Sequence, residues 1–96
     1  MVNIIRILQT PTFKKSVKKL STKQKQDLDM AVRDLLDNPK LGKQKKGDLS
    51  FLHVHKFKMN KQLTLLGYSF NNGSLTLELI ALGSHENFYR DIKRQY

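Results

Sequence analysis

The chain has 96 residues, of which 39% are hydrophobic and 27% charged, a balance typical of a globular domain rather than a disordered segment. We expect a single domain over residues 1–96. Cysteine is absent, which excludes disulfide bonds, thiolate metal sites and a cysteine nucleophile. No apolar run approaches the roughly 20 residues of a membrane span, so we expect a cytoplasmic protein without a membrane partner.

The net charge is the strongest signal in the composition. Eighteen Lys and Arg residues against eight Asp and Glu residues give a formal charge of +10. Such a field attracts nucleic acid, the ribosome, an anionic membrane or an acidic partner protein. A basic surface that serves only solubility is the alternative. Because the basic residues cluster along the chain, we favour nucleic acid or the ribosome.

The first part of the sequence predicts one strand and then a helical hairpin. The β-branched run over residues 4–8 predicts the strand. Thr10 and Pro11 are typical of an N-cap and of the first position of a helix. Ser21 and Gln24 form a capping-box pattern, which begins a second helix. Two short helices joined at this point predict an antiparallel hairpin.

The second part of the sequence predicts a basic loop, three strands and a last short helix. Residues 40–47 contain four Lys and two Gly, which predicts a mobile loop. The turn residues that follow predict successive β-hairpins and therefore an antiparallel meander. The strands are expected over residues 51–58, 62–70 and 75–82, and the helix over residues 86–94.

These elements give the order β-α-α-β-β-β-α and an α+β fold. The apolar stripe of the helical hairpin must be buried, so we expect the hairpin to cover one face of a small antiparallel sheet. The other face is expected to stay partly open. The strand over residues 51–58 is expected to place His53, His55, Lys56 and Lys58 on this sheet, and a solvated face that bears His and Lys is a candidate platform for a polyanion.

His53 and His55 form the first group of residues that could carry chemistry. Alternate positions of a strand share a face, so the two imidazoles are expected to be neighbours. Two histidines could bind a metal, but no third ligand stands at a recognisable spacing, so we expect no metal and no cofactor. Ordinary polar residues on a solvated face and RNA contact are the two remaining interpretations.

His85 and Tyr89 form the second group, because four residues separate them at the start of the last helix and they can share one side of it. A histidine at a strand end is more often a cap or a surface residue. Metal-free RNA cleavage, however, needs a base for the 2′-hydroxyl, an acid for the departing 5′-oxygen and cations near the phosphate. Histidine serves as acid or base near neutral pH, and tyrosine can stack on a nucleobase.

The order of elements, the run Leu65-Leu66-Gly67-Tyr68 and the ending from Ala81 to Asp91 resemble the RelE/ParE toxin superfamily over nearly the whole chain. The resemblance implies a toxin of a type II toxin–antitoxin system with a small antiparallel sheet on a helical hairpin. It also implies one of two activities. RelE-like, YoeB-like and YafQ-like members cut messenger RNA, typically in the ribosomal A site, whereas ParE-like members poison DNA gyrase.

The same resemblance implies roles for particular residues. In YafQ-like members a C-terminal histidine with an aromatic residue one turn later is catalytic, and His85 and Tyr89 match that spacing. In RelE-like members lysines on the second strand and an arginine near the C-terminus act instead. Lys56 and Lys58 lie on the corresponding strand, and His85 occupies the position of the arginine.

We therefore expect an endoribonuclease that cleaves messenger RNA on the ribosome by metal-independent acid–base chemistry. A ParE-like gyrase inhibitor without enzymatic activity and a catalytically silent RNA-binding module are the alternatives. The expected partners are a cognate antitoxin in a hetero-oligomer, messenger RNA and the ribosome.

The central strand lacks the arginine that many nuclease members carry, and Lys61 or Arg90 is the candidate substitute. The expected catalytic residues are His85, Tyr89, Lys56 and Lys58. The expected RNA contacts are His53, His55, Lys61, Arg90, Lys93, Arg94, Lys43, Lys45 and Lys46.

Overall fold

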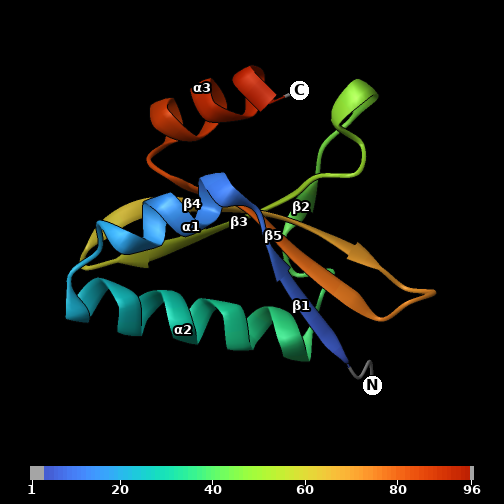
Figure 1. Ribbon diagram of the computed structural model, residues 1–96, viewed down its shortest axis with the longest axis horizontal. Helices are drawn as coiled ribbons and strands as arrows, with labels where there is room; N and C mark the ends of the chain where they lie inside the picture. The colour runs from blue at the N-terminus through green and yellow to red at the C-terminus, as the bar shows by residue number, and fades with distance from the viewer. Residues whose placement is uncertain (1–3, 96) are drawn as a thin grey trace.

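The computed structural model describes residues 4–95, which form a five-stranded sheet with helices on both of its faces (Figure 1). The strands lie in the order β1-β5-β4-β3-β2. Along the chain the elements are β1 (Arg6–Gln9), α1 (Pro11–Lys18), α2 (Thr22–Asp37), β2 (Lys43–Gln44), the short 3-10 helix η1 (Gly47–Leu49), β3 (His53–Met59), β4 (Gln62–Asn71), β5 (Thr76–Gly83) and α3 (His85–Gln95).

The sheet is mixed rather than wholly antiparallel. β3, β4 and β5 form the antiparallel meander that the turn residues predict. β1, however, runs parallel to β5, with Arg6 beside Thr76 and Gln9 beside Leu79. The prediction of an antiparallel sheet is therefore wrong for β1. Its partner lies about seventy residues away along the chain, and no local pattern specifies that pairing.

The two helices of the predicted hairpin begin where their capping residues predict. The Thr10 side chain accepts a hydrogen bond from the Phe13 amide at 3.1 Å, and Pro11 is the first residue of α1. At the start of α2 the Gln24 amide donates to Ser21 Oγ at 3.2 Å, and the Ser21 amide donates to Gln24 Oε1 at 2.8 Å. Both local predictions are confirmed.

The basic segment over residues 40–47 is more ordered than the sequence predicts. Lys43 and Gln44 pair with the first two residues of β3, and the Lys45 amide donates to the Leu52 carbonyl at 2.9 Å. The prediction of a mobile loop is wrong for these residues, because the edge of β3 supplies backbone partners.

Apolar side chains form a separate layer on each face of the sheet. One layer packs beneath α1 and α2, and the other packs beneath α3. Phe88 and Ile92 anchor α3 and are fully buried. The sheet face that we expected to be partly open is thus covered at its centre by α3, which Figure 1 shows on the opposite side of the sheet from α2.

Gly67 in β4 allows α3 to lie directly on the sheet. A Cβ atom at this position would stand 2.6 Å from Phe88 Cζ and 2.7 Å from Phe88 Cε1. Real Cβ atoms do not approach other heavy atoms this closely, so any side chain here must displace the Phe88 ring or the whole helix.

Tyr68, the next residue of β4, holds the start of the basic segment. Its ring is fully buried, and its hydroxyl donates to the Pro39 carbonyl at 2.7 Å. The same hydroxyl accepts a hydrogen bond from the Gly42 amide at 2.8 Å. Burial raises the pKa of Tyr68, because desolvation disfavours the phenolate. One neutral hydroxyl therefore fixes the backbone from which β2 begins.

The packing of α3 on β4 predicts that Gly67→Ala destabilises the protein. The added methyl group overpacks the contact with Phe88, at a cost of about 1–3 kcal/mol in the free energy of unfolding. Urea unfolding measures this cost, and hydrogen exchange should increase along α3. Gly73→Ala is the control, because its Cβ would meet only the end of the Asn71 side chain, at 3.3 Å. Equal stability of the two variants would contradict this account of α3 docking.

The Tyr68 hydroxyl predicts a second effect on stability. Tyr68→Phe leaves the Pro39 carbonyl and the Gly42 amide without their buried partner, at a cost of about 1–3 kcal/mol. Urea unfolding and amide exchange at Gly42 measure the loss. Tyr89→Phe removes a hydroxyl that makes no hydrogen bond within residues 4–95, and should leave stability nearly unchanged. A Tyr68→Phe variant as stable as the parent would show that this anchor is dispensable.

Candidate functional site

The N-terminal end of α3 lies beside a line of residues that crosses three strands. Lys56 in β3 pairs with Leu65 in β4, which in turn pairs with Gly83 at the end of β5. Strands lie about 4.8 Å apart, so Lys56 and Gly83 are separated by roughly 10 Å. His85 begins α3 two residues after Gly83. The turn at residues 83–84 therefore places His85 just beyond the end of β5, at the level of Lys56 in the middle of β3.

His85 and Tyr89 contact each other on one flank of α3, as their spacing predicts. Their ring centroids lie 4.9 Å apart with the rings tilted by 58°. Phe88 supports Tyr89 from the core side, edge to face at 5.1 Å. The Lys45 ammonium lies 5.0 Å from the centre of the Tyr89 ring, in the range of a cation–π contact. The basic segment and α3 thus meet at Tyr89.

His85 is available to a ligand. Its side chain is exposed, and within residues 4–95 its contact is with the Tyr89 ring, while neither of its ring nitrogens hydrogen bonds to a protein group. An exposed imidazole with a free nitrogen beside an aromatic ring can transfer a proton to or from a bound phosphate ester.

Lysines line two hollows that border the basic segment. A hollow of about 550 Å³ follows the edge of β3 beyond β2. A second hollow, of about 380 Å³, lies between η1 and α3 and is lined by Lys46 and Lys93. The basic residues that line the first are Lys43, Lys45, Lys46, His55 and Lys56. The predicted clustering of positive charge around residues 43–46 is present in the structure.

Lys56 and Lys58 are two positions apart in β3, so both side chains lie on the α3 side of the sheet. Lys56 lines the hollow beside the basic segment. Lys58 lies outside that hollow and borders another hollow together with Asp27 and Asp34. Lys56 is therefore the lysine of β3 that is brought together with Lys45.

The rings of His53 and His55 point to the other sheet face from Lys56, although His55 also borders the hollow at the edge of β3 that Lys56 lines. His53 stacks on Tyr68 at 5.4 Å, and His55 stacks on Phe57 at 5.9 Å. Side chains alternate along a strand, so both imidazoles point to the α2 side while Lys56 points to the α3 side. Burial lowers the pKa of both histidines, and for His55 the Asp34 carboxylate partly opposes this effect.

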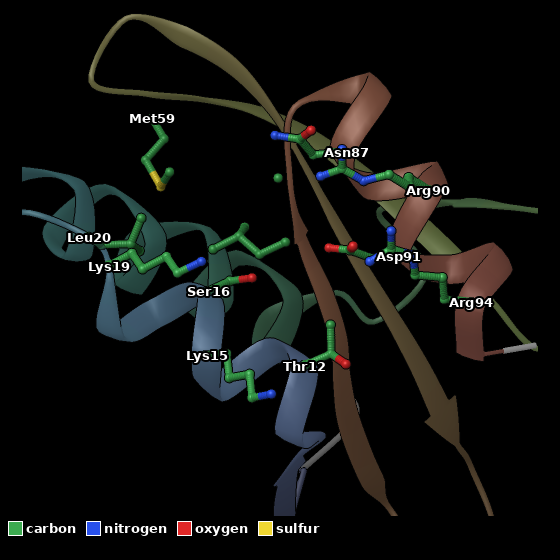
Figure 2. A pocket seen from close by; sticks show the side chains of 12 residues that line it. Thr12, Lys15, Ser16, Lys19, Leu20, Met59, Asn87, Arg90, Asp91 and Arg94 are labelled. Atoms are coloured by element: carbon green, nitrogen blue, oxygen red, sulfur yellow. The ribbon is translucent and has the colours of Figure 1, made fainter.

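Three further residues predicted to contact RNA are not gathered at His85. Arg90 and Arg94 project from the other flank of α3, toward α1 (Figure 2). Lys61 lies in the tight turn between β3 and β4, with a φ of 71°. Lys61 and Arg90 both lie outside the hollow that Lys45 and Lys56 line, and their role in binding phosphate stays a prediction.

Within residues 4–95, no three His, Asp or Glu side chains gather in a way that could hold a metal ion. In the same part of the chain, no helix is long and apolar enough to cross a membrane. The chemistry that these residues offer is therefore that of one exposed imidazole, one aromatic ring and several lysines.

Gly67 and Tyr68 position the site, but neither was among the predicted site residues. A glycine inside a central strand often marks the close approach of another backbone or side chain, and this signal could have indicated the docking of α3.

Solved toxin structures share this fold. A double arginine-to-alanine variant of the Escherichia coli toxin RelE in the free state superposes with a TM-score of 0.70 at 18% identity, covering 98% of each chain. The intact E. coli RelBE toxin–antitoxin complex gives 0.67 at 16% identity, over 82% of this chain and 94% of that chain. The Mycobacterium tuberculosis RelBE2 complex gives 0.61 at 18% identity, over 83% and 96%. Similarity at these identities establishes the fold.

Comparison of sequences establishes the family. No curated protein sequence matches this chain. The family described as the ParE-like toxin of type II bacterial toxin–antitoxin systems, however, matches residues 7–93. Because this match spans most of the chain and the fold agrees with it, the protein belongs to the ParE-like toxins of type II toxin–antitoxin systems, within the RelE/ParE superfamily.

Proposed function

We propose that this toxin is an endoribonuclease that cleaves messenger RNA on the ribosome and that a cognate antitoxin restrains it. The observation that supports the proposal is the contact of exposed His85 with Tyr89. The Lys45 ammonium lies over the Tyr89 ring, 5.0 Å from its centre. An inhibitor that acts by binding alone has no need of a free imidazole among cations.

In the proposed reaction, the ribose 2′-oxygen attacks the neighbouring phosphorus atom while the bond from phosphorus to the 5′-oxygen breaks. A proton leaves the 2′-hydroxyl, and another reaches the departing 5′-oxygen. His85 carries out one of these two transfers. Water exchanges the other proton, because the rings of His53 and His55 stack on Tyr68 and Phe57 instead of on the His85 flank of α3.

The remaining residues of the site supply charge and orientation. Lys56 and Lys45 stabilise the negative charge that develops on the phosphate in the transition state. Tyr89 offers its ring to a nucleobase, for which stacking is worth about 1–3 kcal/mol. Lys43, Lys46 and Lys93 extend the positive surface along which the RNA backbone lies.

The antitoxin is the second proposed partner. Two of the solved neighbours are toxin–antitoxin complexes. A basic toxin of net charge +10 is complementary to a partner with acidic segments. We propose that this partner covers the basic face of the sheet or displaces α3, which Phe88 and Ile92 anchor.

A ParE-like inhibitor of DNA gyrase is the alternative function, and the family match itself favours it. Inhibition by binding requires no proton transfer. The two functions therefore differ in whether His85 is essential.

The proposed mechanism predicts that His85→Gln abolishes toxicity and slows cleavage by about 10²–10⁴-fold, the usual contribution of a proton-transferring side chain. Growth arrest and cleavage of a ribosome-bound transcript should be compared at equal soluble protein. His53→Gln is the matched control, because it removes an imidazole from the opposite sheet face. It should keep most of the parental cleavage rate.

Two results would contradict this mechanism. A His85→Gln variant that cleaves at the parental rate would remove His85 from the reaction. Undiminished toxicity of that variant, with induced DNA damage signalling and intact transcripts, would instead support the gyrase-binding alternative.

The residues of the site also predict that activity needs no tightly bound metal ion. The toxin would be dialysed against EDTA, exchanged into magnesium buffer and added to programmed ribosomes, so that the ribosome keeps its own magnesium. The cleavage rate should equal that of the untreated toxin. Activity that is lost on dialysis and restored by zinc or manganese would overturn the metal-independent mechanism.

A further inference from the structure

A groove of about 530 Å³ lies between α1 and α3, on the flank of α3 that faces away from Tyr89 (Figure 2). β1 pairs with β5 only as far as Leu79, so the last residues of β5 have no neighbouring strand on this side. Leu82 and Gly83 instead form part of the groove. Figure 2 shows side chains from the two helices reaching toward each other past this edge of the sheet.

Each wall of the groove carries two cations. Lys15 and Lys19 come from α1 and its C-cap, and Arg90 and Arg94 come from α3. The members of each pair are four residues apart, about 6 Å along a helix. Asp91 is the acidic residue of the lining, so the groove holds four positive charges and one negative charge.

These cations lack carboxylate partners among the described residues. The ion pairs found within residues 4–95 are Lys23 with Asp27 and Arg33 with Asp29, both on α2. Cations held on facing helices repel one another, and this repulsion is relieved when an anion enters between them. The groove therefore favours an anionic ligand.

The lining indicates a phosphate backbone rather than an acidic amphipathic peptide. Among the apolar residues of the lining, Met59 and Leu82 are 93% or more buried, with exposures of 7% and 4%, and Leu20 is partly buried against the core. They leave little surface for the apolar anchors of a peptide helix. Thr12, Ser16 and Asn87 instead offer hydroxyl and amide groups. Such groups, together with Lys and Arg, make most contacts between proteins and nucleic-acid backbones.

We propose that the groove between α1 and α3 is a second RNA site, which binds phosphodiesters away from the bond that is cleaved. The proposal rests on RNA being the target, as in the proposed function. The two sites share α3 as a wall: Tyr89 faces the basic segment, and Arg90 faces α1. An RNA that occupies both sites passes over the N-terminal end of α3.

The test compares two double variants of α1 that lose the same charge. Lys15→Gln with Lys19→Gln neutralises the groove, whereas Lys14→Gln with Lys18→Gln neutralises exposed lysines outside it. The probe is a short fluorescent 2′-O-methyl RNA, which cannot be cleaved because its 2′-oxygen is blocked. Its affinity for the full chain is measured by fluorescence anisotropy over a range of salt concentrations.

The groove variant should bind more weakly, and its salt slope should fall by about 1.4, which is two contacts at 0.7 each for a single strand. The ratio of the variant's Kd to the parent's Kd should therefore fall roughly sevenfold when the salt concentration rises fourfold. The control variant should change far less. Equal losses in the two variants would show that only net charge matters and would overturn the proposal.

Two further outcomes separate this inference from the nuclease proposal. If the parent binds the probe through the groove but no transcript is cleaved, the groove stands and the nuclease proposal fails. If the groove variant loses affinity for the antitoxin and not for the RNA probe, the groove is a peptide site and the inference is wrong.

Discussion

The missing side chain of Gly67 and the hydroxyl of Tyr68 act from neighbouring positions of β4 on opposite faces of the sheet. On one face the absence of a Cβ atom lets Phe88 press against the strand, which places α3. On the other face the hydroxyl joins Pro39 to Gly42, which places the start of β2. Because both contacts are made by adjacent residues of β4, the position of the basic segment is fixed relative to α3. The contact of the Lys45 ammonium with the Tyr89 ring depends on both.

α3 presents two different surfaces, one on each side of the two fully buried residues that anchor it to the sheet. Phe88 and Ile92 are four positions apart and occupy the buried side. Successive residues of a helix are rotated by about 100°, so Tyr89 and Arg90 emerge on different flanks. One flank carries the imidazole and the aromatic ring, and the other carries the arginines that face α1. A partner that moves this short helix would alter both surfaces at once, so an antitoxin that displaced α3 would change both of them.

Local signals predicted the parts of the fold that depend on neighbouring residues. The caps at Thr10 and Ser21, the hairpin turns and the spacing of His85 and Tyr89 all act within four residues, so the sequence displays them directly. The pairing of β1 with β5 and the meeting of Lys45 with Tyr89 join distant segments, and no local pattern specifies them. The sequence alone could not show which side chains of β3 face α2 and which face α3, because that depends on which face of the sheet the helical hairpin covers. Without that information, the alternation of His and Lys residues could not be assigned to a side.

The distribution of charge links stability to binding in this toxin. Within residues 4–95, the ion pairs lie on α2, whereas the cations around α3 have no carboxylate partners. Unpaired cations on both flanks of α3 repel one another and lower the stability of the free domain. A polyanion or an acidic antitoxin that binds there relieves the repulsion, and its binding energy adds to the stability of the folded state. The same lysines and arginines therefore weaken the isolated domain and would favour any form of it that is bound to an anionic partner.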